Sequence, residues 1–312
     1  MDYRLAVFQA VAEHLSFTRA SRVLHLSQPA VTQHIKALED DLGQALFNRS
    51  SHGITVTSAG ATLLKHARLV ARLDEEVVQQ IRGKGGIISG QLALGATTTI
   101  GQYLLSSWLV QGRQSWPDLK LNVTISNTEE IIEAVLERKI DLGLIEGRCQ
   151  RVGLRAECFL DDEIICVASA RNPLTHGKPA PLSSLKKQIW IFREQGSGTR
   201  DIVEIALKRQ GLDPRKLKID LELSSSETIK AVVATGYGLT FLSRFVVARE
   251  IALGILRPVP VRHLIIRRKL HLISMRGPRP VGAAGAFADL VLKETSHSTG
   301  LAGLAITSAY EI

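Results

Sequence analysis

Short runs of serine, threonine and glycine occur at three places where an apolar segment gives way to a helix-like one. The most distinctive is REQGSGTRD, residues 193–201, in which glycines bracket a serine and an arginine follows a threonine. The other two runs are Thr97–Thr99 and Ser224–Ser226. Small residues let the backbone approach an anion, and hydroxyls, amides and a guanidinium can donate hydrogen bonds to it. Each run alone is more typical of a helix cap, but three together favour an anionic ligand.

The segments around these runs alternate between strand-like and helix-like patterns from residue 91 onward. The strand-like segments are QLALG, KLNVTIS, IDLGLIEG, IICVAS, QIWIF, LKIDLEL and GLTFLS. Such alternation is typical of an α/β fold with a mostly parallel sheet, and the length predicts two sheets. In open α/β sheets the ligand cleft lies at the carboxyl ends of strands, where the three runs fall.

A basic cluster near the end of this region consists of Arg262, Arg267, Arg268 and Lys269. Its pattern is more typical of a solvated strand edge than of a ligand site. Arg200 has two interpretations of equal weight, since it can face a ligand or pair with a carboxylate such as Glu204.

The first 43 residues predict three helices. These are residues 3–12, a segment capped near Ser16 that runs to about Leu24, and a segment that starts after Ser27 and ends at Gly43. Only two residues separate the second and third helices, so they must meet at a sharp angle. The residues expected to form the buried faces of this unit are Ala20, Val23, Val31, Ile35 and Leu38.

Polar residues on the third helix point away from its apolar face, where they can reach base edges in a major groove. They are Gln28, Thr32, Gln33 and Lys36. The following segment, with Ile54 and Val56 after a Ser-Ser-His-Gly turn, predicts a β-hairpin wing. Arg49 and His52 on this wing could touch phosphate or the adjacent minor groove.

From Ser58 apolar residues recur at helical spacing for more than twenty positions. A helix this long outside a compact core needs a partner, and pairing with a second copy of the chain is the common solution. Gly83–Gly90 then breaks the pattern and is predicted to be a hinge.

The run FxxVAEHLSFTRASRVLHLSQPAVTQHIKALEDDLGQALFNRSSHGITVTSAG resembles the N-terminal winged helix-turn-helix of the LysR-type transcriptional regulators. The resemblance implies an α/β chain with an all-α winged head, followed by a linker helix and an effector domain of two α/β subdomains similar to periplasmic binding proteins. The expected domains are residues 1–58 for DNA binding, 59–90 for the linker helix and hinge, 91–296 for effector binding, and 297–312 for a flexible tail.

The same resemblance implies double-stranded operator DNA as a partner, a homodimer formed through the linker helices, and a homotetramer built from dimers. RNA polymerase is a candidate further partner. Carried over by position, the expected DNA-binding residues are Thr18, Gln28, Pro29, Thr32, Gln33, His34, Lys36, Arg49 and His52. His34 stands where Gln or Arg is common in the family.

The effector region is most similar to members that govern sulfur assimilation and carbon fixation, the CysB- and CbbR-like regulators. Their effectors include sulfur oxyanions and phosphorylated metabolites, so the resemblance implies a small anionic effector and no cofactor or metal. The expected effector-binding residues are Thr97, Thr98, Thr99, Glu146, Gly196, Ser197, Thr199 and Arg200.

Two other classes of protein fit parts of the sequence less well. An enzyme is disfavoured because no nucleophile elbow, HExxH, Walker lysine or clustered carboxylate motif occurs, so no catalytic residue is assigned. A solute-binding receptor would fit the α/β region alone, but the winged head and the absence of a signal-peptide pattern argue against it.

Charge and composition support this interpretation only in part. The net charge is +9, yet residues 1–90 hold 10 Lys and Arg against 8 Asp and Glu, so most of the excess lies outside the DNA-binding segment. Three cysteines without CxxC spacing, and no apolar run long enough to span a membrane, favour a cytoplasmic protein without a membrane partner.

Overall fold

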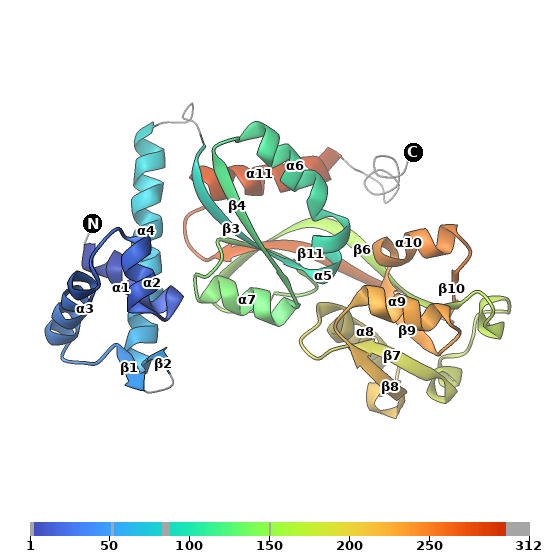
Figure 1. Ribbon diagram of the computed structural model, residues 1–312. Helices are drawn as coiled ribbons and strands as arrows, with labels where there is room; N and C mark the ends of the chain where they lie inside the picture. Colours follow the sequence, from blue (N-terminus) through green and yellow to red (C-terminus); the bar gives the residue numbers. More distant parts are fainter. Residues whose placement is uncertain (1–2, 51–52, 83–87, 150, 298–312) are drawn as a thin grey trace. The chain divides into compact units, whose positions relative to one another are not determined.

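The computed structural model describes residues 3–50, 53–82, 88–149 and 151–297. The chain divides into two compact units, one consisting chiefly of Met1–Gly86 and the other of Ile87–Leu136 and Ile140–Ile312. Figure 1 shows the elements of both units. Each unit has its own hydrophobic core. The predicted tail, apart from its first residue, and most of the predicted hinge lie outside the described residues.

The N-terminal unit is a three-helix bundle followed by a two-stranded wing and a long helix. Its elements are α1 Tyr3–His14, α2 Phe17–Val23, α3 Gln28–Leu42, β1 Phe47–Ser50, β2 Gly53–Val56 and α4 Ser58–Arg82. The Ser16 and Ser27 hydroxyls accept hydrogen bonds from the backbone N–H groups of Arg19 and Ala30, which begins α2 and α3 where the caps predict. Gly43 ends α3 in the left-handed conformation, with φ of 65°.

One predicted core residue of this unit is exposed. Ala20, Val31, Ile35 and Leu38 are buried as expected, but the side chain of Val23 is 57% exposed. Val23 is the last residue of the short helix α2, so the chain turns away before α3 can cover it.

The second unit contains the predicted alternation of strands and helices. Its strands are β3 Gly90–Thr97, β4 Leu119–Ser126, β5 Leu142–Glu146, β6 Leu154–Ser169, β7 Ile189–Arg193, β8 Lys218–Leu223, β9 Leu239–Ser243, β10 Leu256–Pro258 and β11 Ile266–Met275. Its α-helices are α5 Thr98–Tyr103, α6 Leu105–Ser115, α7 Thr128–Leu136, α8 Gly198–Arg209, α9 Ser226–Ala234, α10 Arg244–Ala252 and α11 Gly282–His297. Short 3-10 helices cover Pro173–Thr175, Leu182–Lys187 and Pro214–Lys216.

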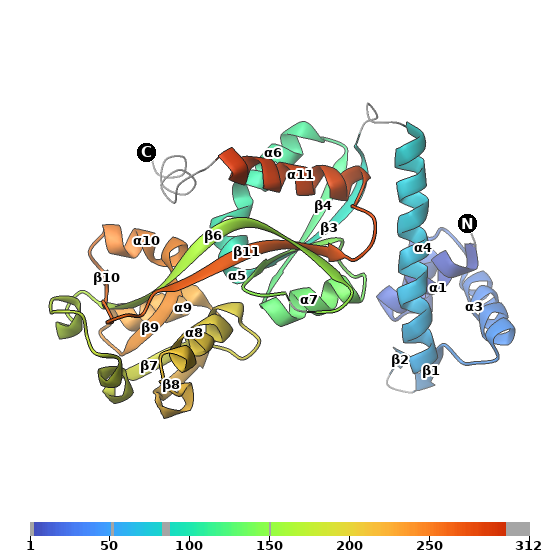
Figure 2. The ribbon, with the colours of Figure 1, turned by 180° about the vertical axis from the view of Figure 1, so that it is seen from behind.

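These strands form one mixed sheet, which corrects the prediction of two mostly parallel sheets. The order is β4-β3-β5-β11-β6-β9-β7-β8, with β10 paired to β6. β3, β4 and β5 pair in parallel, as do β7, β8 and β9, whereas β6 and β11 are antiparallel to each other. At 16 residues, β6 can extend roughly 50 Å. It therefore runs beside β11 through both halves of the unit and joins them (Figure 2).

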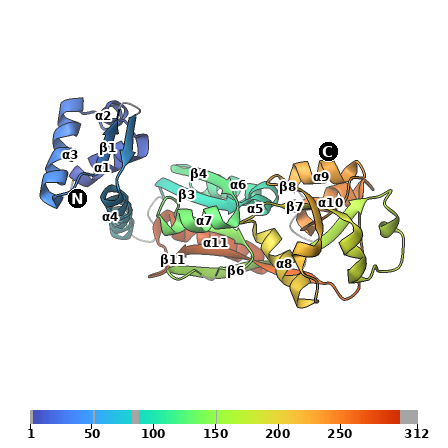
Figure 3. The same ribbon diagram turned by 90° about the horizontal axis from the view of Figure 1, so that it is seen from below.

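Helices cover both faces of each half of the sheet. In the first half, defined by β3, β4 and β5, helices α6 and α11 pack on one face through Trp108 and Phe287, and α7 packs on the other through Ile131. In the second half, defined by β7, β8 and β9, α8 lies on the face opposite α9 and α10 (Figure 3). We call the place where the two halves meet, beside the ends of β3, β5 and β7, the junction.

None of the described helices is both long enough and apolar enough to cross a membrane.

Candidate functional sites

The first candidate site is the outer face of α3. Gln28, Gln33 and Lys36 are exposed, while Val31 and Ile35 are fully buried on the opposite face. Pro29 occupies the first turn of the helix, where its missing N–H removes no hydrogen bond. The polar side chains are therefore presented to solvent on one face.

Hydrogen bonds link this face to the preceding helix. The Thr18 hydroxyl donates to the Gln28 side-chain oxygen at 3.1 Å, and the Thr32 hydroxyl donates to the Gln28 carbonyl at 3.0 Å. The first contact restricts the orientation of Gln28 and connects α2 with α3.

The wing contributes a further cation to the same unit. The Arg49 guanidinium lies 4.6 Å from the centre of the Phe17 ring, and Arg49 is exposed. His34 differs from the other predicted residues because its ring contacts Tyr3 of α1, with 5.8 Å between ring centres. His52 lies outside the described residues.

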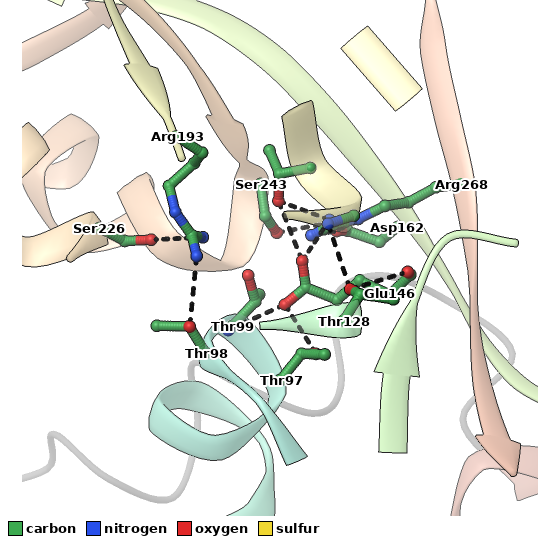
Figure 4. A network of polar contacts seen from close by, with 12 residues as sticks. Thr97, Thr98, Thr99, Thr128, Glu146, Asp162, Arg193, Ser226, Ser243 and Arg268 are labelled. Atoms are coloured by element: carbon green, nitrogen blue, oxygen red, sulfur yellow. Dashed lines mark hydrogen bonds and ion pairs between the residues drawn. The ribbon is translucent and has the colours of Figure 1, made fainter. Parts of the chain in front are cut away.

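The second candidate site is at the junction, where two of the three hydroxyl runs meet around the Glu146 carboxylate (Figure 4). One carboxylate oxygen accepts from the Thr97 hydroxyl at 3.0 Å and from the Thr99 backbone N–H at 2.9 Å. The other accepts from the Thr199 hydroxyl at 2.9 Å and from Arg268 at 2.5 Å. Glu146 ends the buried strand β5, so the predicted residues converge on a carboxylate that belongs to the chain itself.

Arg268 joins this carboxylate to a second one. Its Nε donates to Asp162 at 2.7 Å, and the Ser243 hydroxyl donates to the other Asp162 oxygen at 2.8 Å. Arg268 and Asp162 face each other on β11 and β6, the strands that connect the two halves. The cluster of Glu146, Arg268 and Asp162 is called the buried triad below.

The electrostatics of the buried triad are asymmetric because one guanidinium serves two carboxylates. Burial by itself would raise the pKa of Glu146, but the charge of Arg268 and hydrogen bonds from Thr99 and Thr199 lower it to about 2. Burial raises the pKa of Asp162, and Arg268 and Ser243 do not fully offset that effect. Glu146 is therefore the more firmly ionised of the two carboxylates.

The position of Arg268 corrects the prediction that the basic cluster is a solvated strand edge. Arg262, Arg267 and Lys269 are exposed as expected, but the Arg268 side chain is fully buried. Alternate residues of a strand point to opposite faces, so Arg268 turns inward while both neighbours face outward. Arg267 and Lys269 line a hollow of about 1000 Å³ beside α8, whose lining also includes Asp162 and Arg268.

The turn of the GSGTR run crosses the junction from the second half to the first. The Gly198 N–H donates to the Thr128 hydroxyl at 3.1 Å, and the Glu129 N–H donates to the Gly196 carbonyl at 3.3 Å. A Cβ atom on Gly198 would lie 2.4 Å from the Glu146 carbonyl oxygen. Glycine at this position is what allows the start of α8 to dock against the end of β5, and Ser197 beside it is buried.

Replacing Gly198 by Ala is expected to reduce the free energy of unfolding by about 1–3 kcal/mol, because a backbone atom must move to admit the methyl group. Urea unfolding of the full-length protein measures the effect. Gly177→Ala is the matched control, since its Cβ would meet no atom closer than 4.0 Å. Equal midpoints for the two variants would contradict the docking role of Gly198.

The third hydroxyl run meets a different partner, Arg193, at the end of β7. This guanidinium donates to the Thr98 and Ser226 hydroxyls, each at 3.3 Å. It also forms a two-point ion pair with Glu194, at 2.8 and 3.0 Å. Arg193 stands at the start of the distinctive REQGSGTRD segment but is not among the predicted site residues. A cation at the carboxyl end of a strand, three positions before the first glycine of a turn, is the signal that could have identified it.

Arg200, the predicted alternative, is engaged elsewhere. Its guanidinium pairs with Glu204 at 2.9 Å and with Glu222 at 2.8 Å. The second of its two sequence interpretations, pairing with a carboxylate, is the one the structure shows.

The two units together define a class of protein, a DNA-binding regulator with a ligand-binding α/β domain. Residues 3–61 match the model of the bacterial regulatory helix-turn-helix protein, lysR family, and residues 85–296 match the LysR substrate binding domain. The chain belongs to the LysR-type transcriptional regulators. It is a regulator and not an enzyme, and the predicted fold class of winged head and α/β effector domain is confirmed.

Relatives support the predicted subgroup. The chain is 36% identical to the HTH-type transcriptional regulator CysL of Bacillus subtilis, over 86% of this chain and 89% of that protein. It is 31% identical to the RuBisCO operon transcriptional regulator of Allochromatium vinosum, over 94% of this chain and 96% of that protein. Among solved structures, the regulatory domain of Synechocystis CcmR in complex with 2-PG is similar, with 26% identity and a TM-score of 0.62 over 67% of this chain and 99% of that chain. The similarity to CysB- and CbbR-like members is confirmed.

Proposed function

We propose that this regulator binds operator DNA through α3 and the wing, and that a small anion bound at the junction modulates that binding. The observation that carries the proposal is that Thr98 from the first half of the effector domain and Ser226 from the second half both contact the buried Arg193. A ligand held there would touch both halves and could change their relative arrangement. The 2-PG complex of the similar CcmR domain supports a small ligand in this domain.

The proposed anion is a sulfur oxyanion or a phosphorylated metabolite. Two observations support this class of ligand: the Arg193 guanidinium has hydroxyl neighbours, and its present counter-ion, Glu194, is only partly buried. Guanidinium groups bind carboxylate, sulfate and phosphate groups through two parallel hydrogen bonds.

The proposed operator contacts divide into base-reading and phosphate-binding residues. Gln28, Thr32 and Gln33 on the exposed face of α3 suit base edges in a major groove. Thr18, Lys36 and the wing residue Arg49 suit the DNA backbone. Pro29 would shape the start of the reading helix, and the ring contact of His34 with Tyr3 favours a packing role for that residue.

Gln33→Ala and Arg49→Ala are expected to impair DNA binding in different ways. Loss of a base contact should cost about 1–3 kcal/mol of sequence discrimination with little change in salt dependence. Loss of a phosphate contact should weaken binding to all sequences and lower the slope of log K against log salt concentration by about 1. Fluorescence anisotropy with specific and random duplexes distinguishes the two, and each variant is the control for the other. The assignment fails if Arg49→Ala leaves the slope unchanged.

We further propose a homodimer joined through α4 and a homotetramer built from such dimers. Leu73 and Val77 of α4 are about half exposed in a single chain and lie close together on one face of the helix.

RNA polymerase is the proposed further partner. The cytoplasm is the proposed location, since operator DNA is reached there. The proposed domain limits are 1–58, 59–90 and 91–296.

Footprinting on DNA upstream of the protein's own gene, with and without sulfate, sulfite, thiosulfate and phosphoglycerate, tests the function. The proposal predicts a protected site whose extent changes with at least one of these anions. It fails if no site is protected and no anion alters the pattern.

A further inference from the structure

We infer that Arg193 is the residue that receives the anion, and that Glu194 is a tethered competitor that the anion displaces. The inference rests on the proposed function and assigns the position of its ligand. The inferred anion site excludes most of the effector-binding residues that the sequence predicts, because those residues surround Glu146.

The surroundings of Glu146 cannot take an anion without losing existing contacts. A carboxylate offers about four acceptor positions, and the Glu146 oxygens already accept four hydrogen bonds. Both Glu146 and Asp162 are buried in direct contact with Arg268. An oxyanion that entered beside Glu146 would therefore meet a carboxylate of like charge whose acceptor positions are already filled.

Arg193 has donors that are weakly used. A guanidinium carries five N–H groups, and four hydrogen bonds to Glu194, Thr98 and Ser226 are formed within the described part of the chain. The two bonds to hydroxyls are 3.3 Å long, beyond the usual range of about 2.7–3.2 Å for strong N–H···O bonds. A hydroxyl that accepts from Arg193 keeps its own hydrogen for donation. The Thr98 hydrogen is directed at the Ser126 carbonyl at 3.5 Å, a long contact that Thr98 could exchange for one to an anion also bound by Ser226.

The Glu194 carboxylate occupies the position that the anion would take beside Arg193. It occupies the two-point edge of the Arg193 guanidinium, yet the Glu194 side chain is 24% exposed, whereas that of Arg193 is only 3% exposed. Glu194 can therefore swing toward water while Arg193 stays in place. An oxyanion of similar size could then occupy the same edge, so little new space is required.

A small void beside Arg193 does not itself hold the anion, because Glu194, Thr98 and Ser226 are not among the residues that line it. It measures about 10 Å³ and is lined by Phe192, Arg193, Thr199, Arg200, Val203 and Phe241. That is about the space of one water molecule, so the room for an anion must come from the departure of the Glu194 carboxylate. The inferred site thus selects small oxyanionic groups.

Calorimetric titration of the full-length protein with sulfate, sulfite, thiosulfate and phosphoglycerate tests the inference. Glu194→Gln should tighten binding of the preferred anion about tenfold, as expected if the competitor occupies the site nine-tenths of the time. Arg193→Gln should weaken binding roughly 100-fold. Glu204→Gln is the matched control, since Glu204 also pairs with an arginine and is also 24% exposed, and it should leave the affinity unchanged.

Each outcome is decisive. Tighter binding by Glu194→Gln together with loss in Arg193→Gln supports the inference, and thermal melting checks that both variants are folded. An anion that binds the wild type and Arg193→Gln equally overturns the inference and leaves the proposed function intact. If no anion binds either the wild type or Glu194→Gln, the inference and the proposed anion class both fail.

Discussion

Replacing Arg268 by Met is expected to destabilise the effector domain by about 3–5 kcal/mol, because it leaves two carboxylates buried without a cation. Glu146 and Asp162 lie 2.5 and 2.6 Å from the guanidinium, and both are almost completely buried. Urea unfolding of the full-length protein at neutral pH, monitored by tryptophan fluorescence, measures the loss.

The neighbouring residue supplies the control. Arg267 precedes Arg268 on β11 but is exposed, so Arg267→Met should change stability by less than about 0.5 kcal/mol. Adding Glu146→Gln and Asp162→Asn to Arg268→Met should restore much of the lost stability, because no uncompensated charge then remains. Equal effects of Arg267→Met and Arg268→Met would show that the buried triad has no such role.

The pH dependence of stability follows from the same contacts. The pKa of Glu146 falls from its ordinary 4.5 to about 2 on folding. Its contribution, about 3 kcal/mol, is fully present above pH 4.5 and is lost as the pH falls toward 2. The raised pKa of Asp162 has the opposite sign, since ionisation of Asp162 at higher pH opposes folding. Glu146→Gln should therefore make the free energy of unfolding depend less on pH between about pH 4.5 and 2. At neutral pH, Glu146→Gln should lower the free energy of unfolding more than Asp162→Asn does.

Replacing Leu73 and Val77 together by Glu is expected to weaken operator binding roughly 10²–10⁴-fold, because it removes the link between two DNA-binding heads. Both side chains are about half exposed on one stripe of α4, and pairing of two such stripes would bury them. Charged residues facing each other in that interface would repel. Sedimentation gives the oligomeric state, and anisotropy with the operator gives the affinity.

Ala71→Glu provides the comparison for this variant. Ala71 is exposed on α4 and lies well around the helix from Leu73 and Val77, so a charge there should leave assembly and affinity unchanged. The proposed dimer is wrong if the double variant still forms the wild-type oligomer and binds the operator equally well.

The N-terminal unit could be predicted closely because its signals are local. Ser27, Pro29 and Gly43 fix the limits of α3 through their own backbone preferences, and the structure has those limits. The exposure of Val23 could not be predicted in this way, since it depends on where α2 stops relative to α3.

The single sheet escaped prediction because β6 contains a run of charged residues. The segment Asp161–Glu163 has the pattern of a polar loop, yet Asp162 is buried in the strand. Its cation, Arg268, lies 106 positions away along the chain and directly across the ladder between β6 and β11. No local pattern reveals a partner at that distance.

The contacts at the junction also depend on residues that are distant in the sequence and could not be predicted. The hydroxyl runs were recognisable from Thr97–Thr99 and Gly196–Arg200, but the identity of the groups they contact was not. Only the folded chain shows that Thr97 and Thr199 bind Glu146, whereas Thr98 and Ser226 bind Arg193.

The central claim, that an anion at the junction controls DNA binding, is tested most directly by measuring coupling in both directions. The affinity of the full-length protein for its operator is measured with and without each anion, and the affinity for the anion with and without operator. The account predicts that one anion changes the operator affinity roughly 5–150-fold, and that the operator changes the anion affinity by the same factor. An anion that binds the protein equally well with and without operator would contradict it.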